Sequence, residues 1–376
     1  MAKYDFLIVG AGLFGATCAR LLTDKGYKCL IIEKRAIVGG NCATERKNDI
    51  DIHLYGPHVF HTDDEEVWNF VNKYSKFIDY KHEVLSYSDG KLYHLPINMN
   101  TFNEILGTNS PMEAVKKVND EISRFNVEIS TNLEELAINS CGFSVYNKLI
   151  KPYSEKLWGV ECTKINPMTL AKFPIRFIYD NSYFNEKYQG IPEDGYTKLV
   201  ENIIGEDIDI LLKTDYLQGR EKYDKLASYV IFCGPIDKFC NYIYGPLKWR
   251  SLRFEFSDES NRGNNIYGTP VINIPDSNDD MIRITEHKWF TKDRVNTSDD
   301  FNSHTYISYE YPENWTPEKE CFYPINDGES ENILDKYISF TKENFPNFVF
   351  GGRQGTYRAL SMDETIRLAL NLCNIL

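Results

Sequence analysis

Length, composition and charge exclude several classes of protein. The chain has 376 residues, 42% hydrophobic and 26% charged, as in globular proteins with a large buried core. At ~150 residues per domain, this length indicates two or three domains. No apolar run approaches the ~18 residues of a membrane-spanning helix. A net charge of −13 provides no general attraction to nucleic acid or anionic membranes, so we expect neither as a partner.

The N-terminal sequence and the cysteines indicate a reducing compartment. The opening MAKYDFLIVG lacks the basic, apolar and small-residue order of a signal peptide. The nine cysteines are odd in number and include no C-x-x-C pair. We therefore expect a cytoplasmic protein with free thiols, without a disulfide framework and without a bound metal.

A strand, a glycine-rich turn and a helix are expected at the start of the chain. Residues 5–9 are a short apolar run, typical of a strand that is buried on both faces. Gly10, Gly12 and Gly15 follow in G-x-G-x-x-G spacing, and a helical pattern continues to Gly26. These glycines allow a tight turn, close approach of a pyrophosphate and close packing of helix on strand. The helix N-terminus attracts phosphate, so the segment predicts dinucleotide binding.

The residues after the second expected strand indicate which dinucleotide binds. That strand ends in Glu33, where a carboxylate accepts hydrogen bonds from a ribose diol. The basic residue Lys34 follows, and then Gly40 and Asn41, which bring the backbone close to the cofactor a second time. This arrangement resembles the extended FAD-binding pattern of glutathione-reductase-like flavoproteins. We therefore expect FAD rather than NAD.

The rest of the chain predicts a doubly wound α/β FAD-binding domain of Rossmann-like topology with two insertions. Near the C-terminus, Arg353 follows two glycines and precedes the helical stretch 363–376. The resemblance to these flavoproteins implies that the chain returns here to cover the flavin and that the N-terminus of this helix points at it. The insertions are expected to be a helical bundle and an antiparallel β-sheet. The expected segments are 1–82, 195–245 and 328–376 for the FAD-binding domain, 98–170 for the bundle, and 83–97, 171–194 and 246–327 for the sheet.

Several sequence words together resemble one family over essentially the whole chain. They are Tyr-Gly-Pro-His58-Val-Phe-His61, Tyr183-Phe184-Asn185, Arg283-Ile-Thr-Glu-His, Tyr323-Pro-Ile and Gly352-Arg353-Gln-Gly-Thr-Tyr357. In this order they resemble the bacterial UDP-galactopyranose mutases. The resemblance implies that UDP-galactopyranose and UDP-galactofuranose are interconverted for cell-surface glycan synthesis, with reduced FAD as covalent nucleophile. It also implies a homodimer.

The resemblance assigns roles to individual residues. Arg283, His61 and Lys172 are assigned to catalysis. The guanidinium of Arg283 would bind the oxygens of a departing diphosphate well. For any single aromatic residue, packing in the core is the competing interpretation. The substrate-binding residues implied are Tyr153, Trp158, Lys172, Tyr183, Phe184, Asn273, Arg283, Tyr323 and Tyr357. The cofactor-binding residues are Gly10, Gly12, Phe14, Gly15, Glu33, Lys34, Gly40, Asn41, His58, Arg353, Met362 and Asp363.

Four of the positions that depart from the family pattern leave the substrate open. Lys172 stands where the family has an arginine, and lysine lacks the planar fork. Ala359 and Ser361 replace a tyrosine and an aspartate, and His82 replaces a frequent asparagine. Three alternatives remain: the same chemistry on UDP-N-acetylgalactosamine or dTDP-fucose, an FAD-dependent oxidoreductase, or a flavoprotein that binds a nucleotide sugar without turnover.

Overall fold

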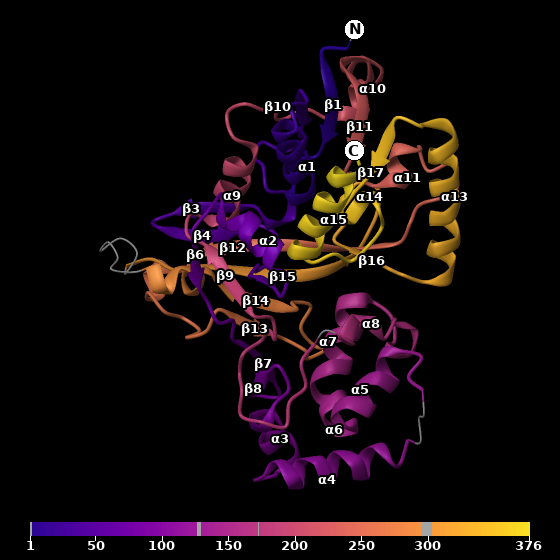
Figure 1. The fold of residues 1–376 in the computed structure, drawn as a ribbon. Coiled ribbons are helices and arrows are strands. Elements are labelled where there is room, and N and C mark those ends of the chain that lie inside the picture. The colour runs from indigo at the N-terminus through magenta and orange to yellow at the C-terminus, as the bar shows by residue number, and fades with distance from the viewer. Residues whose placement is uncertain (1, 126–128, 172, 295–302) are drawn as a thin grey trace.

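A five-stranded parallel sheet forms one part of the molecule (Figure 1). The structure is a computed structural model that describes residues 2–125, 129–171, 173–294 and 303–376. The strand order is β10-β2-β1-β11-β17, and every neighbouring pair is parallel, as in doubly wound folds. The strands are β1 (Tyr4–Val9), β2 (Cys29–Ile32), β10 (Asp209–Leu211), β11 (Ala227–Phe232) and β17 (Phe348–Phe350).

Helices cover both faces of this sheet. On one face α1 packs against α9 and α15, and on the other α11 packs against α13. Successive side chains of a strand point to opposite faces. Ile8 of β1 therefore packs into the hydrophobic core on one face of the sheet, and Leu7 packs into the core on the other face. Both side chains are completely buried. The helices are α1 (Leu13–Asp24), α9 (Gly195–Ile204), α11 (Ile236–Phe239), α13 (Gly328–Asn344) and α15 (Met362–Ile375).

A seven-stranded sheet of order β16-β12-β15-β14-β13-β7-β8 forms a second part of the structure. The sequence predicts an antiparallel sheet, but β13 pairs with β7 in parallel, so the sheet is mixed. These two strands lie far apart in the chain, so no tight turn fixes their relative direction. The strands are β7 (Val84–Ser88), β8 (Lys91–Leu95), β12 (Trp249–Asp258), β13 (Val271–Asn273), β14 (Arg283–Glu286), β15 (Tyr306–Asn314) and β16 (Tyr323–Pro324).

Helices gather below this sheet in Figure 1. Polar side chains start three of them: Asn98, Ser110 and Asn132 each accept a hydrogen bond from a backbone N–H of the first turn. The segments are α3 (Met99–Leu106), α4 (Pro111–Ile122), α5 (Leu133–Cys141), α6 (Phe143–Val145), the π-helix η2 (Tyr146–Ile150), α7 (Lys151–Trp158), η3 (Cys162–Lys164) and α8 (Met168–Ala171).

A three-stranded sheet of order β5-β9-β6 is not hydrogen-bonded to the two larger sheets. The segment 171–194 is expected in the large antiparallel sheet, but its strand β9 pairs instead with β5 and β6. Its strands are β5 (Phe60–Thr62), β6 (Phe77–Asp79) and β9 (Tyr188–Pro192). The boundaries of the three expected domains stay a prediction.

The remaining elements are short, apart from the eight-residue segments α2 and η7. They are η1 (Gly40–Cys42), β3 (Thr44–Lys47), β4 (Ile50–His53), α2 (Glu65–Asn72), η4 (Tyr216–Gly219), α10 (Arg220–Tyr223), η5 (Asp224–Leu226), η6 (Ser260–Arg262), η7 (His287–Arg294) and α14 (Gly352–Gly355). All nine cysteines are free thiols. Within the described ranges, no helix has the length and apolar character needed to cross a bilayer.

Candidate active site

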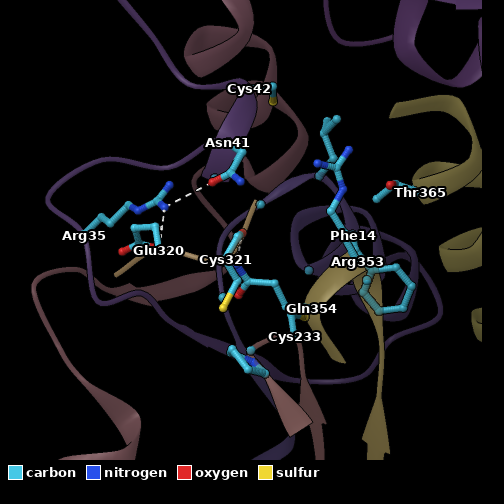
Figure 2. Close-up of a pocket in the computed structure, with 18 of the residues that line it drawn as sticks. Phe14, Arg35, Asn41, Cys42, Cys233, Glu320, Cys321, Arg353, Gln354 and Thr365 are labelled. Atoms are coloured by element: carbon cyan, nitrogen blue, oxygen red, sulfur yellow. Dashed lines mark hydrogen bonds and ion pairs between the residues drawn. The ribbon is translucent and has the colours of Figure 1, made fainter. Parts of the chain in front are cut away.

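A cleft of about 420 Å³ lies at the carboxyl ends of β1, β2 and β11 (Figure 2). This is where open α/β sheets bind their ligands. The expected cofactor residues on the cleft wall are Gly10, Gly12, Phe14, Gly15, Glu33, Lys34, Gly40, Asn41, His58, Arg353 and Met362. The structure therefore brings together residues from both ends of the chain.

Glycines allow the backbone segments at the floor of the cleft to pack closely and leave room for a phosphate beside them. A Cβ on Gly15 would lie 2.0 Å from the carbonyl oxygen of Gly10, so only glycine fits there. Gly40 has a φ of +58°, and its Cβ would lie 3.0 Å from the Cα of Gly12. Gly12 also caps the N-terminus of α1. The free backbone N–H groups of the first helical turn therefore face a cradle suited to an anionic group.

Arg35 carries an unsatisfied donor at the same cleft. Its Nη2 donates to Asn41 Oδ1 and to Glu320 Oε2, both at 3.1 Å (Figure 2). Its buried Nη1 has no hydrogen-bond partner among the described residues. Glu33 accepts the backbone N–H groups of Ala11 and Arg35, both at 2.8 Å. A dinucleotide with its diphosphate would satisfy Nη1, so the residues present fit FAD.

The cleft is more basic than the chain as a whole. Five basic and three acidic side chains line it, although the net charge of the chain is −13. The basic ones are Lys34, Arg35, Lys238, Lys319 and Arg353, and the acidic ones are Glu33, Asp215 and Glu320. Arg353 is held by the carbonyl oxygens of Phe322 and Leu360, at 3.2 and 2.6 Å. This local excess of positive charge favours an anionic ligand.

A second group of polar residues surrounds Arg283 on the mixed sheet. Its Nη2 donates to the hydroxyl of Tyr153 at 2.7 Å, and its Nη1 donates to Glu310 Oε2 at 3.1 Å. Its Nε lies 3.3 Å from Asn273 Oδ1, which accepts the third hydrogen bond. The strand register explains this arrangement, because Arg283 pairs with Asn273 on β13 and with Glu310 on β15. The guanidinium is thus fixed from three directions.

Arg283 is positively charged in its pair with Glu310. Burial opposes the charge of Arg283, but attraction to Glu310 and to nearby tyrosines raises its pKa well above the usual value. Burial raises the pKa of Glu310, and attraction to Arg283 limits that rise. A fixed cation in a site largely removed from water interacts strongly with an anionic ligand.

Aromatic hydroxyls lie beside this cation. Burial raises the pKa of Tyr183 and of Tyr323 to about 12, so both remain protonated hydrogen-bond donors at neutral pH. The ring of Tyr323 lies 6.0 Å from that of Trp158. Tyr153, Tyr183 and Tyr323 all interact electrostatically with Arg283. The group therefore combines one cation, several phenol donors and an indole.

Phe184 and His61 connect this group to the cleft, since both line its wall. Their rings are stacked with centroids 3.9 Å apart. The ring of Phe184 also lies next to that of Tyr183, with centroids 5.1 Å apart. His61 Nδ1 lies 3.2 Å from Glu186 Oε1. A ligand bound in the cleft therefore borders the arginine and tyrosine group.

The structure does not bring every expected residue to these two groups. Tyr357 is buried and donates its hydroxyl to the carbonyl oxygens of Lys248 and Ile325, so it is removed from the candidate substrate residues. Asp363 is not on the cleft wall; it accepts from Thr62 at 3.0 Å and helps to fix the start of α15. Lys172 lies outside the described residues.

The other departures from the family pattern have identifiable surroundings. His82 is buried with its ring 5.3 Å from that of Tyr183, and burial together with repulsion from Arg283 lowers its pKa to about 3. It is therefore neutral at physiological pH. Ser361 precedes α15 and donates to Glu364 at 2.9 Å, while Ala359 is exposed.

Lys156, which the sequence does not single out, fixes the geometry around Arg283. Its Nζ donates to the carbonyl oxygens of Ile274, Asp276 and Met281, at 2.9, 2.6 and 3.0 Å. Lys156 lies on α7, between Tyr153 and Trp158, and the three carbonyls belong to the loop between β13 and β14. All three donors of the ammonium group are used, so the loop and the helix are joined.

Comparison with known proteins decides the family. The family model described as UDP-galactopyranose mutase matches residues 148–359, and a model of NAD(P)-binding Rossmann-like domains matches residues 8–74. A probable UDP-galactopyranose mutase from Klebsiella pneumoniae is 38% identical, over 98% of this chain and 94% of the relative. The chain belongs to the UDP-galactopyranose mutase family. The predicted α/β fold, the mutase activity and FAD as cofactor are thereby confirmed.

Two further relatives of this mutase refine the picture. A dTDP-fucopyranose mutase from Escherichia coli is 36% identical, over 98% of this chain and 97% of the relative. A crystal structure of reduced UDP-galactopyranose mutase superposes with a TM-score of 0.75 over all of this chain and 94% of that one, at 15% identity. The crystal structure supports the fold. The dTDP-fucopyranose mutase raises the question of which nucleotide sugar is the substrate.

Proposed function

We propose that the mutase converts UDP-galactopyranose and UDP-galactofuranose into each other, with reduced FAD bound in the cleft. One observation carries this proposal: Arg283, fixed from three directions, lies in a group that meets the cleft through Phe184 and His61. The diphosphate of a nucleotide sugar is thereby brought to the cation while the sugar reaches the cofactor.

The chain's own residues supply binding and electrostatic stabilisation. Gly12, the start of α1 and Arg35 would hold the cofactor diphosphate. Reduced FAD, when bound, supplies the nucleophile for the anomeric carbon. As the bond from this carbon to the diphosphate oxygen breaks, Arg283 stabilises the negative charge on the diphosphate, and Tyr183 and Tyr323 donate hydrogen bonds to it. Trp158 and Tyr153 offer aromatic faces to the base.

A dTDP-fucose mutase is the second candidate, because the Escherichia coli relative is nearly as similar as the Klebsiella one. Dithionite-reduced protein should be assayed with UDP-galactofuranose and with dTDP-fucofuranose, and kcat/KM compared. We expect the UDP-sugar value to be larger by roughly tenfold or more, since one methyl or hydroxyl contact contributes on that scale. A larger value for the dTDP-sugar would assign the second function instead.

Lys156→Met is expected to raise the KM for the nucleotide sugar about tenfold with a smaller change in kcat. Methionine keeps most of the unbranched side chain but removes three hydrogen bonds to the loop between Asn273 and Arg283, each contributing roughly 1 kcal/mol. Steady-state kinetics of the reduced protein measure both constants. Lys164→Met, on an exposed side chain, is the matched control. An unchanged KM in a folded Lys156→Met variant would show that this contact does not order the substrate site.

We also propose that the mutase works in the cytoplasm as a homodimer. The free cysteines and the substrate class support the first part, and the family resemblance supports the second.

A further inference from the structure

Three histidines connect the mixed sheet to the cofactor cleft. His53 ends β4, His287 begins η7, and His58 lies in the turn before β5. His53 is 1% exposed and His287 is fully buried. The ring of His53 lies 6.5 Å from that of His58 and 5.9 Å from that of His287, and both pairs are stacked. His58 lines the cleft, whereas the other two are not on its wall.

Two hydrogen bonds link these histidines in a series, because a ring nitrogen of one accepts from the backbone N–H of the next. The backbone N–H of His58 donates to Nδ1 of His53 at 3.0 Å. The backbone N–H of His53 donates in turn to Nδ1 of His287 at 3.2 Å. A backbone N–H only donates, so each of these Nδ1 atoms must be an unprotonated acceptor. The main chain at His58 is thus held by His53, and the main chain at His53 is held by His287.

The same argument assigns the ring protons of His287 and His58. Neutral His287 carries its proton on Nε2, which therefore donates to the hydroxyl oxygen of Ser308 on β15, 2.9 Å away. His58 Nδ1 lies 2.7 Å from the carbonyl oxygen of Gly56, which only accepts, so this Nδ1 carries a proton. The Nε2 of neutral His58 is then left with a free lone pair.

Burial favours the neutral rings that this series requires. It lowers the pKa of His58 to about 4 and that of His287 to about 3. Burial, together with repulsion from the other histidines, lowers the pKa of His53 well below its usual value. All three rings are therefore uncharged at neutral pH. A protonated Nδ1 on His53 or His287 could not accept its backbone N–H.

We propose that His53 and His287 are positioning residues that fix the Gly56–His58 turn, so that His58 presents an unprotonated Nε2 to the bound cofactor. The contribution to turnover rests on the proposed function, but the contribution to the cofactor environment does not. Ser308 anchors the series on the sheet that also carries Arg283 and Glu310, on β14 and β15. The histidines thereby fix the position of the cofactor cleft relative to the group around Arg283.

Two replacements of His53 separate positioning from mere packing. The side-chain oxygen of asparagine occupies nearly the place of Nδ1 and accepts the His58 N–H, whereas leucine has a similar volume and accepts nothing. We expect His53→Leu to retain FAD but to shift the visible absorption spectrum and the reduction potential of the flavin. Its kcat should fall roughly tenfold or more, because small displacements of groups at the reacting centre cost rate. His53→Asn should retain the spectrum and potential of the unchanged protein.

A second pair makes the test independent of whether His53→Leu folds. His287→Asn places an oxygen near Nδ1, and His287→Gln places it near Nε2. We expect the asparagine variant to preserve the flavin spectrum and the glutamine variant to change it. His94→Leu, on the edge strand β8 of the mixed sheet, is the control for loss of a histidine. Identical spectra and potentials in His53→Leu, His53→Asn and the unchanged protein would overturn the proposal. Because both readouts need no substrate, they remain decisive even if the proposed turnover is absent.

Discussion

Arg283→Ala is expected to abolish turnover while FAD stays bound. The guanidinium is the fixed cation of the site, and it lies on the mixed sheet rather than on the cleft wall. Loss of one such donor lowers kcat by about 10² to 10³. The measurement is the rate of ring conversion by dithionite-reduced protein, with flavin content read from the visible absorption.

Arg283→Lys provides the matched comparison for this prediction. Lysine keeps a positive charge opposite Glu310, which would otherwise be left buried without its partner. It cannot also bind Tyr153 and Asn273 in the plane of a guanidinium, so we expect intermediate activity. An Arg283→Ala variant with normal FAD content and more than about a tenth of the original kcat would contradict the role assigned to Arg283.

Gly12→Val is expected to prevent FAD uptake without preventing folding. A Cβ at Gly12 would meet the Cα of Gly40 at 3.7 Å, which is an ordinary contact, so the backbone tolerates a side chain. The branched methyl groups, however, would extend into the cleft beside Gly12 and Gly40, where a pyrophosphate approaches the backbone. The purified variant should therefore be colourless, with circular dichroism like that of the original protein.

Gly328→Val is the control for this change. Gly328 starts α13 with no heavy atom within 4 Å of its added Cβ, and it lies away from the cleft wall. This variant should retain its flavin. Normal flavin content in Gly12→Val would refute the placement of the cofactor diphosphate against the backbone of Gly12.

The cofactor half of the site follows largely from local sequence. Gly10, Gly12 and Gly15 act through backbone conformation and contacts at short range, and the strand before them ends at Val9 as expected and begins one residue earlier, at Tyr4. Such features depend on neighbours in the chain, so spacing alone reveals them. The departure is Asp363, whose position inside the first turn of α15 directs it to Thr62 and away from the cleft.

The substrate half depends on pairing between distant strands, which sequence spacing does not show. Glu310 lies directly opposite Arg283 only because β15 pairs with β14 in one particular register. Its one local signal is alternation, since Glu310 stands between Tyr309 and Tyr311 at a buried position of β15. For Tyr357 the sequence predicts a substrate-binding residue, but the structure places it in the core. It belongs to a recognisable sequence word, but its φ of +51° and its packing against Trp249 place the ring in the core.

The most direct test of the account is conversion of UDP-galactofuranose by reduced and by oxidised protein. Purified protein carrying FAD should be reduced with dithionite under anaerobic conditions, incubated with the furanose form and analysed by chromatography for the pyranose form. We expect conversion in the reduced sample and none in the oxidised control. Equal conversion in both samples, or none in a reduced protein with full FAD content, would contradict a reduced-flavin mutase acting on this nucleotide sugar.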